Sequence, residues 1–203
     1  MTNSNSSNSP YILEMRNVSK TFPGVKALDQ INLRVKRGSV HALMGENGAG
    51  KSTLMKILYG IYIPDEGGEL ILDDKPFKPG RPIDAIRRGL TMVPQEISPA
   101  ANLTIADNFY LGREITKGKF FLNQKAMNEQ ASAILKELGV PMDVTEKMSD
   151  VSVAKAQLVA IATAVSNDAK VIIMDEPTTA LTENEVDQLY RIIETVKARG
   201  IAI

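Results

Sequence analysis

The sequence predicts an α/β fold, in which strands and helices alternate, with a helical subdomain inserted into it. Short apolar runs typical of strands alternate along most of the chain with segments whose apolar residues recur at helical spacing. Between about residues 97 and 158 only the helical pattern remains, which indicates the inserted subdomain. With 203 residues, the chain is long enough for one large domain with its own core.

The first strands are predicted around a turn. Residues 11–16 and 31–36 have the pattern of strands, and Phe22-Pro23-Gly24 between them is a turn sequence. Another strand is expected over residues 69–73, directly after the turn-rich stretch 64–68. These segments would form the early part of the sheet structure.

A glycine-rich loop with a recognisable pattern lies between residues 45 and 53. Residues 45–53 read Gly-Glu-Asn-Gly-Ala-Gly-Lys-Ser-Thr, which fits the pattern G-x-x-x-x-G-K-[ST]. The mostly apolar stretch 39–44 before the loop predicts a buried strand, and Leu54, Ile57 and Leu58 after it have helical spacing. A chance match in a glycine-rich turn is the alternative, but the expected order of strand, loop and helix argues against it.

The residue types in this loop suit a nucleotide. Its glycines let successive backbone N–H groups point at one phosphate group, and the N-terminus of the following helix adds positive partial charge. Lys51 can then reach the β- and γ-phosphates, and the Ser52 hydroxyl can bind Mg²⁺.

Three longer helices are predicted in the second half of the chain. Asn123 is expected to cap the first, and Ser152 to begin the second over residues 153–166. The third follows Thr182, because apolar residues recur on one face as far as Val196.

A second motif that carries chemistry is the stretch 171–174 with the acidic residues after it. Its continuous apolar run is typical of a strand buried in a parallel sheet. Such a strand would fix the carboxylate of Asp175 beside a metal ion, and Glu176 could orient and polarise an attacking water molecule. An ordinary acidic pair at a strand end is the alternative, which the phosphate loop upstream argues against.

Composition excludes several classes of protein. Lys+Arg and Asp+Glu number 24 each, so binding to nucleic acid through bulk charge is not expected. The absence of cysteine excludes disulfides, thiolate metal sites and cysteine catalysis. Residues 1–10 are small and polar and are expected to form a disordered tail rather than a signal peptide. The longest uncharged internal segment, 156–167, is too short to span a bilayer. We therefore expect a soluble, cytosolic protein.

Taken together, the phosphate loop, Gln95 and the run from Asp175 to Leu181 resemble the ATPase domain of an ABC transporter. The resemblance covers nearly all of residues 11–203. Several strings resemble the branch of simple-sugar (ribose, galactose and xylose) importers in particular, and they lie at residues 22–29, 41–47, 94–96, 103–104 and 111–114. The implied fold is a P-loop NTPase, with an ABC-type ATPase core, an antiparallel β subdomain and the inserted helical subdomain.

The resemblance also implies a role for each site residue. Phe22 falls where the family stacks an aromatic ring on adenine, and a loop aromatic that covers the core is the alternative. Gln95 matches the glutamine that touches Mg²⁺ and senses the γ-phosphate, and Glu176 matches the catalytic base. The implied nucleotide-binding residues are Phe22, Gly45, Asn47, Gly48, Ala49, Gly50, Lys51, Ser52, Thr53, Gln95 and Ser152, and the implied Mg²⁺ ligands are Ser52, Gln95 and Asp175.

The sequence departs from the family at two places. The signature Leu-Ser-Gly-Gly-Gln corresponds to residues 151–155, Val-Ser-Val-Ala-Lys, in which only Ser152 is kept. Ser152 either contacts phosphate or caps the following helix. Thr182 stands where the family usually has Asp, and with Glu185 it forms the pattern of a capping box. The single histidine, His41, is interpreted as a structural strand residue.

The implied function is Mg·ATP binding and hydrolysis that powers import of a monosaccharide. The implied partners are a membrane permease, a second ATPase half or subunit and, indirectly, a sugar-binding protein, with no nucleic acid. The chain would then act on the inner face of the cell membrane. Because no histidine follows Lys51 and no second ATPase half is present, the chain resembles the amino-terminal part of a longer protein and is expected to hydrolyse ATP weakly.

Two alternatives remain open from the sequence. The first is a nucleotide-binding module that hydrolyses little and serves as half of a paired site, which the altered signature favours. The second is a soluble ABC ATPase of translation or DNA repair, which the even charge balance argues against.

Overall fold

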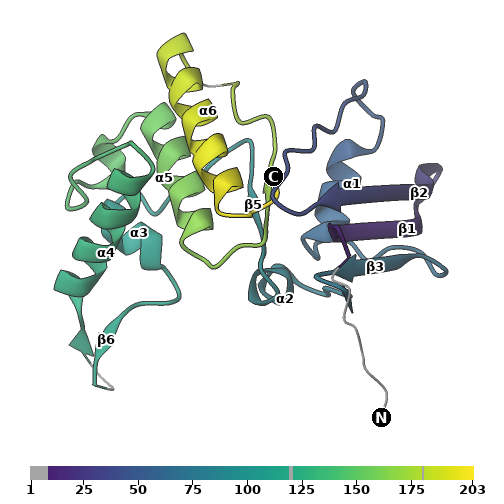
Figure 1. Ribbon diagram of the computed structural model, residues 1–203, viewed down its shortest axis with the longest axis horizontal. Coiled ribbons are helices and arrows are strands. Elements are labelled where there is room, and N and C mark those ends of the chain that lie inside the picture. The colour runs from purple at the N-terminus through teal and green to yellow at the C-terminus, as the bar shows by residue number, and fades with distance from the viewer. Residues whose placement is uncertain (1–8, 119–120, 180) are drawn as a thin grey trace. The chain divides into compact units, whose positions relative to one another are not determined.

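The computed structural model describes residues 9–118, 121–179 and 181–203, and the chain forms two compact units (Figure 1). The first unit comprises Met1–Thr91, Ala169–Ile173 and Lys197–Ile203, and the second comprises Met92–Asp168 and Met174–Val196. Most of the predicted tail, residues 1–8, lies outside the described residues.

The first unit contains the predicted antiparallel sheet. Its order is β2-β1-β3-β4, with β1 Tyr11–Phe22, β2 Val25–Lys36, β3 Glu69–Leu72 and β4 Lys75–Pro76. Phe22 pairs with Val25 across the turn at Pro23-Gly24, where glycine accommodates a φ of +80°. The strands predicted at 11–16, 31–36 and 69–73 are therefore confirmed, and the first two are longer than the sequence indicated.

The helix predicted after the phosphate loop is confirmed as α1, Lys51–Leu58. Its buried residues Leu54, Ile57 and Leu58 belong to the core that also contains the inner face of β1. Immediately before α1, Gly50 has a φ of +87°, and a Cβ atom there would lie 2.5 Å from the carbonyl oxygen of Ala27 on β2. Only glycine permits this approach of the loop to the sheet.

The strand predicted over residues 39–44 is wrong, and His41 is accordingly not a strand residue. The stretch has no regular secondary structure, and Leu43 and Met44 are 39% and 88% exposed. In the described part of the chain, its backbone hydrogen bonds are confined to Ser39 and His41, which pair with Ile203 at 2.9 and 2.7 Å. A buried parallel strand needs hydrogen-bonded neighbours along its length, and this stretch lacks them.

The strand predicted at 171–174 is confirmed as β8, Val171–Met174, which pairs with β5, Leu90–Val93. The N–H groups of Val171 and Asp175 donate to the carbonyl oxygens of Gly89 and Val93, both at 3.1 Å. From the first of these bonds to the second, the residue number increases in both strands, so the two strands run parallel. A short helix that the sequence did not indicate, α2 Pro82–Arg87, precedes β5.

The second unit contains the helices expected over residues 97–158. They are α3 Ile105–Tyr110, α4 Gln124–Glu137, the 3₁₀ turn Met148–Asp150 and α5 Val153–Val165, followed later by α6 Glu183–Ala198. Asn123 caps α4, since its side chain accepts a hydrogen bond from the N–H of Ala126 at 3.3 Å. A short hairpin of β6 Thr116–Lys117 and β7 Phe121–Leu122, which the helical pattern did not predict, lies before α4.

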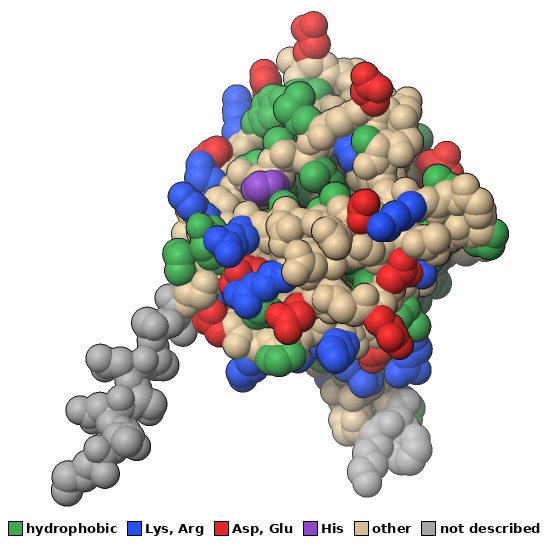
Figure 2. Space-filling model, turned by 90° about the vertical axis from the view of Figure 1, so that its right-hand side faces the viewer, with side chains coloured by type: hydrophobic (Ala, Val, Ile, Leu, Met, Phe, Trp, Pro, Cys, Tyr) green, Lys and Arg blue, Asp and Glu red, His purple; other side chains and the backbone are tan. Residues whose placement is uncertain are grey.

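Charged side chains of both signs are interspersed over the face drawn in Figure 2, in agreement with the even totals of acidic and basic residues. Within the described residues, no helix is long and apolar enough to cross a membrane.

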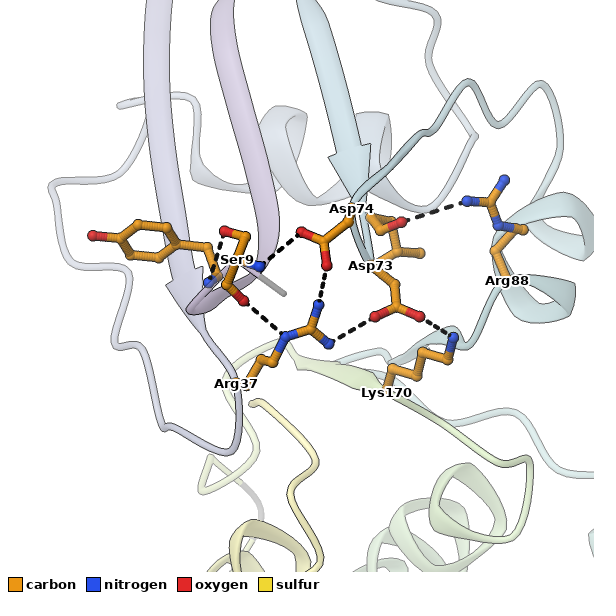
Figure 3. Close-up of polar contacts among 8 residues, drawn as sticks. Ser9, Arg37, Asp73, Asp74, Arg88 and Lys170 are labelled. Atoms are coloured by element: carbon orange, nitrogen blue, oxygen red, sulfur yellow. Dashed lines mark hydrogen bonds and ion pairs between the residues drawn. The ribbon is translucent and has the colours of Figure 1, made fainter. Parts of the chain in front are cut away.

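An ion-pair network fastens the turn between β3 and β4 to neighbouring segments (Figure 3). Asp73 accepts from the guanidinium of Arg37 at 2.7 Å and from the ammonium of Lys170 at 2.5 Å. Arg37 also donates to Asp74 at 2.8 Å and to the carbonyl oxygen of Ser9 at 3.0 Å. Ser9, which the sequence assigned to the disordered tail, is thereby held against the sheet. The hydrogen bonds from Lys170 and Arg37 lower the pKa of Asp73 to about 2.

The substitution Asp73→Asn tests this network. At pH 7 it should lower the free energy of unfolding by about 1 kcal/mol, the upper end for partly exposed ion pairs. Because the pKa of Asp73 is lowered on folding, the stabilisation is complete above about pH 4 and is lost as the pH falls towards about 2. Urea unfolding of both proteins at several pH values measures the difference.

The matched control is Asp84→Asn, which removes only a 3.5 Å ion pair with Arg81. Equal stability of wild type and Asp73→Asn at pH 7, or a difference that stays constant down to pH 2, would contradict the assignment.

Candidate functional site

The phosphate loop lies in the first unit and is open to solvent. Gly45, Asn47, Gly48 and Ala49 are exposed, as is the Ser52 side chain on the first turn of α1, while Gly50, Lys51 and Thr53 are half-buried. Gly48 and Gly50 both have a φ of +87°, a conformation that L side chains rarely adopt. The loop backbone therefore bends as a phosphate cradle requires.

The ammonium of Lys51 is held across its own loop. It donates to the carbonyl oxygens of Gly45 at 2.5 Å and Glu46 at 2.9 Å. These carbonyls are neutral acceptors, whereas a phosphate group would offer charged oxygens, and charge-assisted hydrogen bonds are about twice as strong. The geometry thus keeps the cation at the loop, where an incoming phosphate can replace the carbonyls.

Phe22 lies at the end of β1, half-buried, in the same unit as the loop. Its ring meets that of Tyr62 with centroids 5.2 Å apart and planes at 72°. Tyr62 was not predicted here, because an isolated tyrosine belongs to no recognisable sequence pattern.

The remaining predicted residues belong to the second unit. Gln95 follows β5 and Asp175 and Glu176 follow β8, so the three residues come after the carboxyl ends of two paired parallel strands. The side-chain amide of Gln95 donates to the carboxylate of Glu176 at 3.1 Å. The backbone N–H of Asp175 is fixed to Val93 at 3.1 Å. The structure therefore brings Gln95 and Glu176 together after the ends of these two strands, although strand β5 was not predicted from the sequence.

Glu176 adopts an unusual backbone conformation, with a φ of +43°. Left-handed backbone is unfavourable for a residue other than glycine and is concentrated at functional sites. The hydroxyl of Thr179 donates to the carbonyl oxygen of Glu176 at 3.1 Å, which helps to hold this turn.

Ser152 caps α5. Its hydroxyl oxygen accepts a hydrogen bond from the N–H of Lys155 at 3.3 Å, so the capping role that the sequence left open is present in the structure. Val153, where the family signature has glycine, is 70% exposed. At the start of α6, the Glu185 carboxylate accepts from both the N–H and the hydroxyl of Thr182, at 2.9 and 2.8 Å. These bonds lower the pKa of Glu185.

The predicted magnesium ligands have suitable chemistry. Ser52, Gln95 and Asp175 offer hydroxyl, amide and carboxylate oxygens, the donor types that Mg²⁺ prefers. Among the described residues no group of three or more His, Cys, Asp or Glu side chains could hold a metal ion. A set with a single carboxylate fits Mg²⁺ bound together with substrate phosphates, since Mg²⁺ keeps few protein ligands at such sites.

Comparison with known proteins places these features in a family. The model of the ABC transporter family matches residues 28–179, which contain the phosphate loop, Gln95 and the β8 motif. The chain belongs to the ABC transporter family.

Members of this family closely resemble the chain. The galactose/methyl galactoside import ATP-binding protein MglA of Fusobacterium nucleatum is 48% identical over 196 residues, a match covering 97% of this chain and 39% of that protein. The corresponding protein of Clostridium perfringens is 49% identical, covering 95% of this chain and 37% of that protein. The chain thus spans about two fifths of the length of these curated relatives.

A solved ABC ATPase also shares the fold. The ADP conformation of MJ1267, an ATP-binding cassette of an ABC transporter, superposes with a TM-score of 0.80 at 26% identity, covering 95% of this chain and 79% of that one. The predicted P-loop NTPase fold of the ABC ATPase type is therefore confirmed.

The capping role of Ser152 is tested by two substitutions. Ser152→Ala should lower the free energy of unfolding by about 1 kcal/mol, whereas Ser152→Asn should preserve stability, because asparagine can accept the same hydrogen bond. Denaturant unfolding measures both variants, with Ser149→Ala on the preceding 3₁₀ turn as the control. If the alanine and asparagine variants unfold at the same denaturant concentration, the cap contributes nothing.

Proposed function

We propose that this chain is the Mg·ATP-binding and hydrolysing domain of an ABC importer for a simple sugar. The observation that carries the proposal is the hydrogen bond between Gln95 and Glu176, which follow two paired parallel strands. The chain is also a member of the ABC transporter family, and its Lys51 is hydrogen-bonded within the phosphate loop. The names of the relatives, which describe import of galactose and methyl galactoside, support the sugar class.

Each residue has a proposed role. Lys51 and the backbone N–H groups of residues 45–53 hold the phosphates, and Phe22 stacks on adenine. Ser52 and Asp175 bind Mg²⁺, which neutralises charge on the phosphates when it is bound. Gln95 touches the metal and senses the γ-phosphate, and Glu176 orients the attacking water and accepts its proton.

The proposed partners follow from the transporter role. ATP hydrolysis would drive movement of a membrane permease, and a sugar-binding protein would deliver the sugar to that permease. A second ATPase half or subunit would complete the paired nucleotide site. The domain would then act on the cytoplasmic face of the cell membrane.

A second candidate function is a nucleotide-binding module that hydrolyses ATP slowly. The exposed Val153 favours it, because this side chain stands where the family signature offers only backbone. The slow module is also favoured by Ser152, because its hydroxyl oxygen already accepts a hydrogen bond as the cap of α5.

Phosphate binding is tested with Lys51→Ala. Mg·ATP should bind to this variant about 10- to 150-fold more weakly, because removing a hydrogen bond to a charged group costs about 1.5–3 kcal/mol. Calorimetry on the 203-residue chain measures the affinity, and Lys75→Ala on strand β4 is the matched control. Equal affinities for wild type and Lys51→Ala would rule out the assignment of the phosphate loop.

The role of Glu176 is tested by separating binding from turnover. Glu176→Gln should lower steady-state ATP hydrolysis by about 10²- to 10⁴-fold, the usual contribution of a general base, while ATP affinity changes little. Glu183→Gln at the start of α6 is the control. Hydrolysis by the chain that is unaffected by Glu176→Gln would exclude Glu176 as the base.

A further inference from the structure

The aromatic pair of Phe22 and Tyr62 is the feature that the proposed function leaves unexplained. Their edge-to-face arrangement, with centroids 5.2 Å apart, is one that aromatic rings prefer. Both side chains are half-buried, and Tyr62 also packs against the core of the first unit. The Phe22 ring therefore has a fixed neighbour on the protein side.

The loop that carries Tyr62 is bonded at both ends. At its start, the N–H groups of Ile61 and Tyr62 donate to the carbonyl oxygen of Lys56 in the last turn of α1, at 2.8 and 3.2 Å. At its end, the N–H of Asp65 donates to Ser19 on β1 at 2.9 Å. Hydrogen bonds thus attach the loop both to the end of α1 and to β1, the strand that ends at Phe22.

Side chains of β1 strengthen the second attachment. The ammonium of Lys20 donates to the carbonyl oxygen of Ile63 at 2.8 Å, and the hydroxyl of Thr21 donates to the carboxylate of Asp65 at 2.8 Å. The two residues immediately before Phe22 are therefore both held to the loop by their side chains.

Two cations further restrict the rings. Lys20 lies over the Phe22 ring with its nitrogen 5.4 Å from the centroid, and Lys56 lies over the Tyr62 ring at 5.6 Å. Both distances are within the range of cation–π attraction. Lys56 belongs to α1, the helix that begins at Lys51. The aromatic pair and the phosphate loop are consequently connected through one short helix.

We propose that Tyr62 is a positioning residue for the nucleotide base. It holds the ring of Phe22 at a fixed angle, so that the ring can stack on adenine while the phosphates lie on the Lys51 loop. The inference rests on the proposed function, and Tyr62 acts through Phe22 without touching the nucleotide. A residue that only fills the core would affect the two ends of the nucleotide equally.

The experiment compares two ligands on the 203-residue chain. Mg·ATP carries the base, and Mg·tripolyphosphate carries only the phosphates. Tyr62→Leu should weaken Mg·ATP about two- to tenfold, the range that an aromatic pair contributes, and should leave Mg·tripolyphosphate unchanged. Tyr62→Phe should restore the wild-type affinity because it keeps the ring.

A double-mutant cycle with Phe22→Leu identifies the route of the effect. If Tyr62 acts through Phe22, Tyr62→Leu should cause no further loss of ATP affinity in the Phe22→Leu background. The matched control is Tyr59→Leu, because Tyr59 is another half-buried tyrosine at the end of α1 that packs on the same core. It should not change the ratio of the two affinities.

Several outcomes would overturn the inference. They are an equal loss of affinity for both ligands in Tyr62→Leu, additive effects in the cycle, failure of Tyr62→Phe to restore affinity, or the same change of ratio in Tyr59→Leu. Failure of the proposed function is distinguishable: Lys51→Ala would then leave both ligands bound as in wild type, or Phe22→Leu would leave the ratio unchanged.

Discussion

The close approach of Gly50 to β2 is the constraint on which the geometry of the first unit depends. With the backbone of residue 50 left-handed and no room for a Cβ beside Ala27, the phosphate loop lies directly against the strand. The same strand begins at Val25, which pairs with Phe22. The spacing between the phosphate loop and the aromatic ring is thus set by the backbone, which has far less freedom than side chains.

Local patterns were sufficient to predict much of this molecule. The helix after the phosphate loop, the caps at Asn123 and Ser152 and the strand before Asp175 each depend on residues within a few positions of one another. The meeting of Gln95 and Glu176 was implied only by the family resemblance, because strand β5 before Gln95 was not predicted from the sequence. The antiparallel sheet required the family resemblance in addition.

Features that depend on distant partners were missed. The apolar stretch 39–44 has the composition of a buried strand, but composition does not reveal whether neighbouring strands pair with it, and here only Ser39 and His41 find partners among the described residues. The contacts of Tyr62 and of the Asp73 network also depend on partners that are distant in the sequence. Their interactions join residues far apart in the chain, such as Asp73 with Lys170, and no periodicity marks such pairs.

The left-handed backbone of Glu176 has a consequence for how this chain can evolve. Glycine, or asparagine to a lesser extent, would occupy the same conformation with less strain. In a mutant library selected for heat resistance alone, glycine or asparagine would therefore replace glutamate at position 176. Such a substitution would stabilise the fold and remove the carboxylate. Only a selection that requires the chemistry of that carboxylate would keep glutamate there. Stability and activity therefore favour different residues at position 176.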